Sequence, residues 1–261
     1  MKRFEANHQA QQCAEFIKEA KNIVALTGAG ISTAAGIPDF RGPDGLYSLT
    51  HKRAPFYGRK YDPEKVFDIN YFYSDPLPFF DFARDLLHVI ENVKPTFTHH
   101  FLAELEKQGK LKGIITQNID ALHHQAGSKK VYEMHGSIWK GYCLESREEF
   151  SYEQLKEKIL KEKIPRSFYG GVIKPDIVFF GENVKYFAES IQLAERADLF
   201  FIIGSSCVVQ PAASLSLYTK GKIIVVNKGN IDLPMGAVTM HVEDDIDIFF
   251  KNVAKCLTGQ G

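Results

Sequence analysis

The sequence has no net charge, no long apolar run and no closely paired cysteines. Its 32 basic and 32 acidic side chains cancel, which argues against a nucleic-acid binder that relies on a general basic field. Its longest apolar runs, such as residues 199–203, fall far short of the roughly 18 residues that suggest a membrane helix. The first residues include Lys2 and Arg3, but no apolar segment follows them, as it would in a secretory signal. These absences predict a soluble, cytoplasmic protein with no direct contact to nucleic acid or membrane.

The four cysteines, Cys13, Cys143, Cys207 and Cys256, lie far apart in the sequence. Without a CxxC pair, neither a thiol redox motif nor a self-contained zinc knuckle is indicated. In a reducing compartment such thiols stay reduced. We interpret Cys13, Cys207 and Cys256 as small buried apolar side chains.

The 261 residues allow one large domain that carries a smaller module. Continuous apolar runs are typical of parallel strands covered on both faces; they lie at residues 22–27, 113–116, 176–180, 198–203 and 222–226. Helical patterns cover residues 7–20, 97–108, 184–196, 211–221 and 245–256. This alternation predicts an α/β fold with a Rossmann-like, doubly wound parallel sheet.

Two segments interrupt the alternation. Residues 48–92 are rich in aromatic residues and proline, and we expect a helical insertion. Residues 136–171 are charged and lysine-rich, with one helix expected at 152–161. The two segments together are expected to form a small domain inserted in the large one. The large domain would then comprise residues 1–47, 93–135 and 172–261.

Glycine-rich and polar segments follow the first strand. Gly28 and Gly30 allow a tight turn and a close approach to a pyrophosphate, although Thr33 stands where a third glycine is usual. A plain tight turn would explain this segment nearly as well. The loop after it carries Asp39, Phe40 and Arg41, which could cover a dinucleotide or form a solvated turn.

Further polar residues follow the other strands. Residues 116–120 (TQNID) end a buried strand, where ligands of α/β sheets bind; a helix N-cap by Asn118 or Asp120 is an equally good interpretation. His135 is a candidate base because imidazole titrates near neutral pH, although a lone histidine more often has a packing role. Residues 204–206 and Asn227 follow the last two strands, where they could hold ribose or adenine.

Taken in chain order, these segments resemble the sirtuin family of NAD-dependent protein deacylases. The matching segments are GAGISTAAGIPDFRGPDGLY (28–47), TQNIDALHHQAG (116–127), HGS (135–137), KPDIVFFGE (174–182), GSSCVVQPAA (204–213) and VVN (225–227). The resemblance implies a Rossmann-like domain and a small domain, with NAD and an acyl-lysine peptide meeting in the cleft between them.

The resemblance also implies the roles of individual residues. His135 would be the general base, and Asn118 would position the ribose and a water. The residues implied to bind NAD are Gly28, Ala29, Gly30, Ile37, Asp39, Phe40, Arg41, Gln117, Asn118, Ile119, Asp120, Gly204, Ser205, Ser206, Asn227, Asp245 and Ile246. The implied products are nicotinamide, O-acyl-ADP-ribose and free lysine, and Phe40 would shield the reacting face from water.

The implied peptide site lies between residues 181–183 and 208–209, where the peptide would add a strand. Its residues are Val178, Phe180, Gly181, Glu182, Val208 and Val209. Family members that prefer acidic acyl groups carry a Tyr and an Arg three residues apart after the DFR loop, whereas residues 70–75 (NYFYSD) contain no arginine. Neutral acyl groups are therefore favoured, although Arg53 and Arg59 upstream leave the point open.

One departure from the family concerns zinc. The small domain usually carries two CxxC pairs, but here Cys143 is followed three residues later by Ser146, and the second pair is replaced near residues 165–170. A structural zinc needs four strong ligands, so we predict none. The module would then depend on packing by Tyr142, Phe150, Tyr152, Leu155, Ile159, Phe168 and Tyr169.

Two other functions remain open from the sequence. A mono-ADP-ribosyltransferase or NAD glycohydrolase would use the same pocket, and a protein that binds NAD without turnover would need no base. The intact His135 and Asn118 favour the deacylase, while the missing zinc ligands give the non-catalytic alternative a little support.

Overall fold

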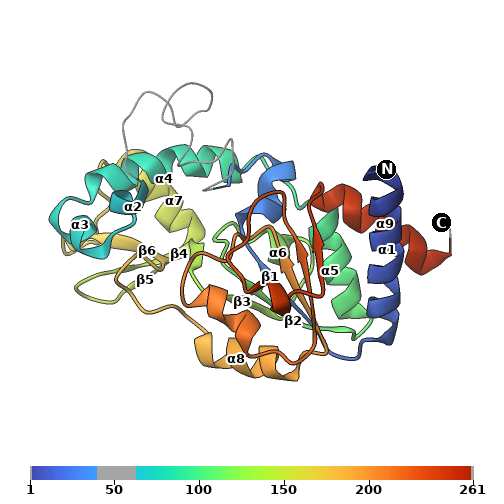
Figure 1. Cartoon of the computed structure of the whole chain (residues 1–261). Coiled ribbons are helices and arrows are strands. Elements are labelled where there is room, and N and C mark those ends of the chain that lie inside the picture. The colour runs from blue at the N-terminus through green and yellow to red at the C-terminus, as the bar shows by residue number, and fades with distance from the viewer. Residues whose placement is uncertain (1, 40–62, 260–261) are drawn as a thin grey trace.

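Six parallel strands form the main sheet of the computed structural model, which describes residues 2–39 and 63–259 (Figure 1). In spatial order they are β3 (Val131–Glu133), β2 (Leu111–Thr116), β1 (Ile23–Thr27), β7 (Leu199–Ile203), β8 (Lys222–Val226) and β9 (Met240–Val242). Numbered along the chain within this sheet, the order is 3-2-1-4-5-6. This is the doubly wound order of dinucleotide-binding folds, and its switch point lies between β1 and β7.

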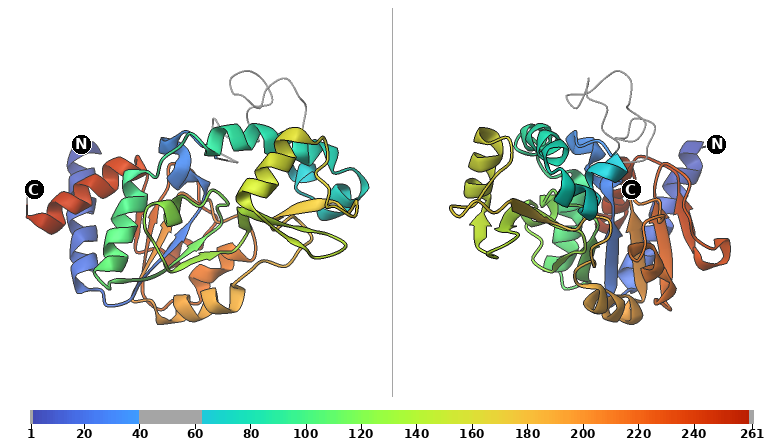
Figure 2. Two further views of the ribbon diagram at one scale, coloured as in Figure 1. Left: turned by 180° about the vertical axis from the view of Figure 1, so that it is seen from behind. Right: turned by 90° about the vertical axis from the view of Figure 1, so that its left-hand side faces the viewer.

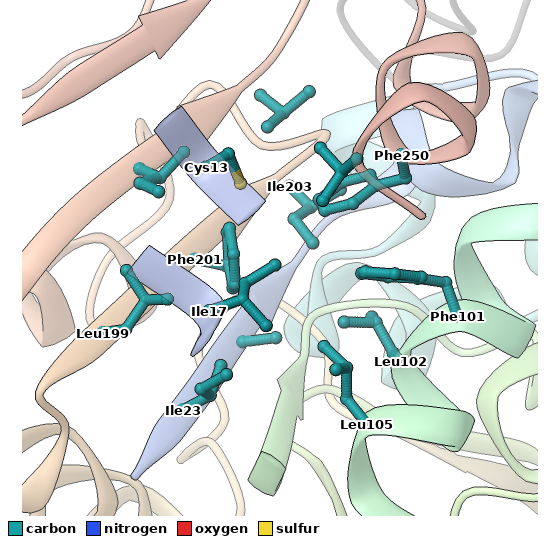
Figure 3. Packing of buried hydrophobic residues seen from close by; sticks show 14 of the residues in the cluster. Cys13, Ile17, Ile23, Phe101, Leu102, Leu105, Leu199, Phe201, Ile203 and Phe250 are labelled. Atoms are coloured by element: carbon teal, nitrogen blue, oxygen red, sulfur yellow. The ribbon is translucent and has the colours of Figure 1, made fainter. Parts of the chain in front are cut away.

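Helices cover both faces of this sheet because its strands carry apolar residues on both sides. Ile23 and Ala25 of β1 belong to one buried cluster, and Val24 and Leu26 belong to another. The first cluster includes residues of α1 (Lys2–Glu19), α5 (Phe97–Lys107) and α9 (Ile246–Thr258), and the second includes residues of α8 (Phe187–Arg196) and the 3₁₀ helix η2 (Ala212–Leu217). Figure 2 shows α1, α5 and α9 together at one end of the molecule. Figure 3 shows Ile17, Phe101, Phe201 and Phe250 converging in the first cluster.

A smaller unit lies at the opposite end from α1 and α9 (Figure 1). Its antiparallel sheet has the order β5 (Glu149–Ser151), β4 (Gly136–Cys143), β6 (Ile173–Ile177). It also contains α2 (Pro63–Val66), α3 (Ile69–Ser74), α4 (Leu77–Ile90) and α7 (Tyr152–Lys161). Phe67, Phe72, Phe79 and Phe179 meet in its core with ring centroids 4.9–5.9 Å apart, mostly edge to face, and the Phe79 and Phe179 rings are tilted by 52°. Residues 63–92 of the expected helical insertion contain α2, α3 and α4, while residues 48–62 lie outside the described residues.

The prediction that a strand at residues 176–180 belongs to the parallel sheet is wrong. The observed β6 ends at Ile177 and pairs with β4 in the small antiparallel sheet. An apolar run indicates a buried strand but not its partner. Pro175 lies in β6 and lacks an N–H, which suits an edge strand of a small sheet better than a central parallel strand.

Other differences are smaller. The helix expected from Pro211 is the 3₁₀ helix η2, and α1 begins earlier than residue 7. The strands β3 and β9 are missed because each has only three residues. The packing role of Phe168 and Tyr169 is wrong, since these side chains are 91% and 85% exposed, whereas Leu155 and Ile159 are buried as expected. None of the helices in the described part of the chain is long and apolar enough to span a membrane.

Candidate active site

A candidate site residue lies just beyond the carboxyl end of each of the six parallel strands. These residues are Gly28 after β1, Gln117 after β2, His135 after β3, Gly204 after β7, Asn227 after β8 and Asp245 after β9. All of them line one cavity of about 1400 Å³. The cavity lies at the sheet edge where the doubly wound fold binds ligands.

The other predicted site residues lie around the same cavity wherever the structure describes them. The cofactor set adds Ala29, Gly30, Ile37, Asp39, Asn118, Ile119, Asp120, Ser205, Ser206 and Ile246. The substrate set is Val178, Phe180, Gly181, Glu182, Val208 and Val209. Phe40 and Arg41 lie outside the described residues. The folded chain therefore brings together segments that are up to about two hundred residues apart, although the individual roles stay predictions.

Two glycine turns touch at the switch point of the sheet. The Gly30 N–H donates to the Gly204 carbonyl at 2.9 Å. A Cβ on Gly30 would lie 2.7 Å from Gly204 Cα, and Gly204 has a φ of +63°. Glycine is therefore needed at both positions for steric reasons. Thr33 departs from the usual third glycine at no steric cost, because its side chain is exposed and donates to the Gly30 carbonyl at 3.0 Å.

Asn118 and Asp120 turn back toward the first glycine turn. The Asn118 amide donates to the Gly28 carbonyl at 3.2 Å and to Ser32 Oγ at 3.3 Å. Ser32 donates to Asp120 Oδ2 at 2.7 Å. Burial raises the pKa of Asp120 from its ordinary value, against the opposing effect of these hydrogen bonds. Ser32 was not predicted as a site residue, although it lies within the matched segment 28–47.

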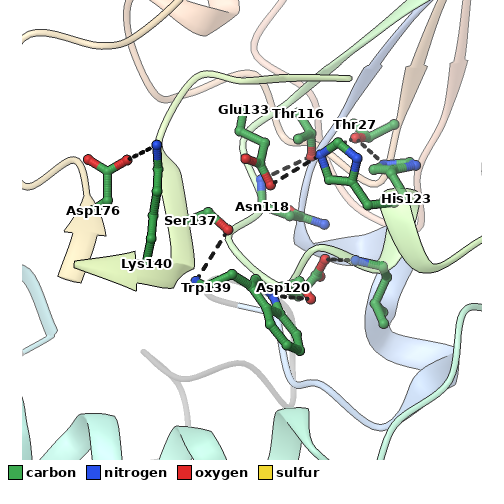
Figure 4. A network of polar contacts seen from close by, with 12 residues as sticks. Thr27, Thr116, Asn118, Asp120, His123, Glu133, Ser137, Trp139, Lys140 and Asp176 are labelled. Atoms are coloured by element: carbon green, nitrogen blue, oxygen red, sulfur yellow. Dashed lines mark hydrogen bonds and ion pairs between the residues drawn. The ribbon is translucent and has the colours of Figure 1, made fainter. Parts of the chain in front are cut away.

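Buried hydroxyls and an imidazole lie beside this loop (Figure 4). Thr116 Oγ1 accepts from the Asn118 N–H at 3.1 Å and lies 2.9 Å from Thr27 Oγ1. The same Thr27 hydroxyl lies 2.9 Å from His123 Nε2. Burial lowers the pKa of His123 well below its ordinary value, so the ring is neutral. The position of Asn118 is therefore set by the ends of both β1 and β2.

His135 is held in the tautomer that suits a base. Its Nδ1 lies 3.0 Å from the Gln117 carbonyl, which can only accept a hydrogen bond. The ring therefore carries its proton on Nδ1, which leaves the Nε2 lone pair available. Burial lowers the pKa of His135, more than the hydrogen bond to Gln117 raises it. The ring is consequently neutral at pH 7 and able to take a proton.

This geometry predicts an acidic limit to turnover. If His135 is the general base that the family resemblance implies, it must be neutral, and kcat/KM should fall as the pH drops through an apparent pKa below 6.5, the ordinary value for histidine. The measurement is a pH profile of kcat/KM for the peptide substrate between pH 5 and 9. An apparent pKa above 7 for the limiting base would contradict the assignment.

Other polar groups of the cavity form hydrogen bonds and an ion pair with neighbouring residues. The Gln117 amide donates to Ser205 Oγ at 3.0 Å. Asp245 caps α9 by accepting from the Ile248 N–H at 3.1 Å, and it pairs with Lys228 at 2.9 Å. Burial acts to raise the pKa of Asp245, but Lys228 and the cap outweigh it, so the pKa is lowered. The carboxylate is thus charged and fixed at the cavity wall.

These features fit a bound dinucleotide. A Cβ on either Gly28 or Gly30 would lie 2.7 Å from the Gly204 turn, so the backbone itself forms the cradle. The buried side chains of Asn118, Asp120 and Ser205 offer hydrogen bonds within the same cavity. A close backbone approach together with polar groups at strand ends is the arrangement that nucleotide cofactors use.

The residues around Cys143 do not fit a structural zinc. Its Sγ lies 3.3 Å from Glu145 Oε2 and 3.5 Å from Ser167 Oγ, and it accepts from the Ser146 N–H at 3.5 Å. Hydroxyls do not replace thiolates or imidazoles as zinc ligands. Within residues 2–39 and 63–259, no three His, Cys, Asp or Glu side chains gather as a metal-binding group.

Purified protein is therefore expected to contain well under one zinc per chain. A chelator should leave its melting temperature unchanged, since packing around Leu155 and Ile159 holds the small unit. Elemental analysis, followed by thermal melts with and without chelator, checks both points. One zinc per chain that resists the chelator would show that the prediction is wrong.

Comparison with known proteins places the chain among relatives of one family. The family model described as the Sir2 family matches residues 28–211. An NAD-dependent protein deacetylase of Thermotoga maritima is 43% identical over 221 residues, which cover 82% of this chain and 85% of that protein. An NAD-dependent protein deacetylase of Saccharolobus solfataricus is 42% identical over 236 residues, covering 89% and 90%.

Solved structures show the same similarity. A Sir2 structure with a deacetylated p53 peptide and 3′-O-acetyl ADP-ribose has a TM-score of 0.85 and 39% identity, over 94% of this chain and 96% of the other. A Sir2 structure with a p53 peptide and NAD⁺ has a TM-score of 0.83 and 38% identity, over 96% and 98%. The fold and cavity define a Rossmann-type nucleotide-binding protein. More specifically, the chain belongs to the Sir2 family.

Proposed function

We propose that this chain is an NAD-dependent protein-lysine deacylase that releases nicotinamide, O-acyl-ADP-ribose and free lysine. The observation that carries the proposal is His135, a buried neutral imidazole with its Nε2 lone pair available in a cavity lined from all six strand ends. Relatives of 40–43% identity are named NAD-dependent protein deacetylases or deacylases. NAD, when bound, supplies an electrophilic ribose carbon and nicotinamide as its leaving group.

His135 acts as the general base. With Nδ1–H held by the Gln117 carbonyl, Nε2 accepts a proton from a ribose hydroxyl. The Gln117 carbonyl then stabilises the imidazolium that forms. General bases of this kind contribute about 10²–10⁴-fold to a rate.

Asn118 and Asp120 form the polar wall of the nicotinamide end. Both side chains are buried and fixed by Ser32, so their dipoles need no reorientation during the reaction. The apolar side chains of Ile37 and Ile119 line the same part of the cavity and help to exclude water. Asp120 thus acts as a hydrogen-bonding group that Ser32 holds in place at the cavity wall.

The acyl-lysine peptide lies between residues 181–183 and 208–209. Phe180 and Val208 line the cavity while remaining 43% and 48% exposed, which leaves apolar surface for a peptide to cover. Main-chain pairing gives a loose sequence preference, and the absence of an arginine in residues 70–75 favours neutral acyl groups. Solved Sir2 structures contain acetylated and propionylated peptides.

We also propose a division into domains and a cellular location. The NAD-binding domain comprises residues 1–47, 93–135 and 172–261, and the small domain comprises residues 48–92 and 136–171. The protein acts in the cytoplasm, and it binds neither nucleic acid nor membrane. Its zero net charge supports the absence of a nucleic-acid partner.

Nicotinamide release tests the proposal. The protein is incubated with NAD alone, with NAD and an unmodified lysine peptide, and with NAD and the acetylated form of that peptide. Nicotinamide should appear only with the acetylated peptide, and in equal amount to free lysine. Release without peptide would indicate a glycohydrolase, and ADP-ribose attached to protein would indicate a transferase.

A further inference from the structure

A fully buried lysine lies directly behind the peptide side of the cavity. Lys174 of β6 is 1% exposed. Its Nζ donates to Glu182 Oε2 at 2.8 Å and to the Ile177 carbonyl, and it lies 4.2 Å from the centre of the Phe179 ring. Burying a charge is unfavourable unless it is paired and hydrogen-bonded. Lys174 meets both conditions through a single short segment, residues 177–182.

Glu182 folds that segment into a closed turn. Besides Lys174, its Oε2 accepts from the Phe179 N–H at 2.8 Å. The Glu182 N–H donates in return to the Phe179 carbonyl at 3.0 Å, and Gly181 supplies the left-handed φ of +93°. The ammonium group thus connects the start of the turn, at Ile177, with its end, at Glu182.

Backbone hydrogen bonds connect the turn to the proposed base and to the segment around α3. The Val178 N–H donates to the His135 carbonyl at 2.8 Å, which ties the turn to the backbone of the proposed base. On the other side, the Phe180 N–H donates to the Phe67 carbonyl at 2.7 Å, and the Ile69 N–H donates to the Phe180 carbonyl at 3.0 Å. Val178, Phe180, Gly181 and Glu182 all line the cavity. A shift of this turn would move the peptide site and the base together.

We propose that Lys174 and Glu182 are a positioning pair that fixes residues 177–182 for acyl-lysine peptide binding and keeps the Glu182 carboxylate neutralised at the cleft. This inference rests on the proposed deacylase function and adds a residue, Lys174, that does not itself line the cavity. The pair acts through the turn, and neither side chain takes part in the chemical step. An apolar residue at position 174 would fill the space but would leave Glu182 uncompensated and the Ile177 carbonyl without its donor.

Three variants test the pair: Lys174→Met, Glu182→Gln and the double variant. Each is compared with Lys140→Met, which removes a lysine from a neighbouring ion pair with Asp176 in the same sheet, where the Lys140 side chain is 65% exposed. Binding of a fluorescent acetyl-lysine peptide is measured without NAD, so the result does not depend on turnover. KM for peptide and KM for NAD are then measured separately, with the melting temperature of each variant.

Lys174→Met is expected to weaken peptide binding and raise the peptide KM by about 10–100-fold, since a displacement near 1 Å can cost about a hundredfold. KM for NAD should change less than about twofold, because the hydrogen bond between the two glycine turns joins Gly30 to Gly204 and involves no residue of this segment. Glu182→Gln keeps an acceptor for the Phe179 N–H, so it should lose less peptide affinity than Lys174→Met. The double variant should recover part of the Lys174→Met loss, because no unpaired carboxylate remains. Lys140→Met should match the wild type.

Wild-type peptide affinity in folded Lys174→Met would overturn the inference. So would equal losses in peptide and NAD affinity that follow the melting temperature, which would indicate a general structural role. If Lys174→Met does not fold, the peptide affinity of Glu182→Gln is the deciding measurement. An unchanged peptide affinity in Glu182→Gln would overturn the inference as well. A wild-type protein that neither binds nor deacylates the peptide would overturn the proposed function itself.

Discussion

Replacing His135 by alanine is expected to reduce deacylation by about 10²–10⁴-fold, the contribution of a positioned general base. Affinity for NAD should remain nearly unchanged, because the glycine turns and Asn118 are held by contacts that do not include the His135 side chain. Single-turnover deacylation assays and calorimetric NAD titration measure the two quantities on the same preparation.

His124→Ala is the matched control. His124 is the neighbour of the buried His123, but its side chain is 43% exposed, pairs with Glu133 and lies outside the cavity. This variant should keep wild-type turnover. Wild-type turnover in His135→Ala would show that another group is the base, and loss of NAD binding in that variant would show that His135 has a structural role instead.

Replacing Gly204 by alanine is expected to affect both the fold and the cofactor site. The new Cβ would lie 2.4 Å from the Ile31 backbone nitrogen, at a φ of +63°. Steric overlap and left-handed strain together cost about 3 kcal/mol. At roughly 2–4 °C per kcal/mol for a chain of this size, the melting temperature should fall by about 6–12 °C. NAD binding should weaken by about tenfold or more, because the two glycine turns must separate.

Gly236→Ala provides the comparison, since a Cβ there would have no heavy atom within 4 Å. Its melting temperature and its NAD affinity should equal those of the wild type. Thermal melts and NAD titration of both variants give the result. Unchanged melting temperature and NAD affinity in Gly204→Ala would mean that the glycine turns are not packed as described.

Much of the site can be predicted from the sequence because each strand ends in a recognisable segment. Gly28, Gln117, Gly204 and Asn227 all follow apolar runs, and parallel strands bring their carboxyl ends to one edge. The order of these segments also carries the resemblance to the family. No single segment would suffice, since each is also compatible with a turn or a helix cap.

The remaining features depend on tertiary contacts that have no local signature. β6 is apolar like the parallel strands, yet it pairs with β4 because the turn after His135 directs the chain into the small sheet. Gly136 allows this turn: its φ is +72°, and a Cβ there would lie 1.9 Å from the Asp176 carbonyl oxygen. Likewise, the burial of Lys174 follows from Glu182, a partner eight residues away, and not from any property of the lysine itself.

The exposed pair Phe168 and Tyr169 shows the opposite error. Aromatic residues in a charged module are expected to pack, but here the pair lies at the end of a short loop and its rings contact each other, with centroids 5.3 Å apart. Apolar residues are common at protein surfaces, so apolar character alone does not establish burial. The core of the small unit comes instead from the phenylalanines of α3, α4 and the segments beside them.

Mass spectrometry of the products formed from NAD and an acetyl-lysine peptide tests the proposed deacylase chemistry most directly. We expect one O-acetyl-ADP-ribose and one nicotinamide for each lysine freed over many turnovers, and the multiple-turnover rates of all three should fall by the same factor in His135→Ala. Free acetate with unmodified ADP-ribose as the first products, or nicotinamide formed without loss of the acetyl group, would contradict this chemistry.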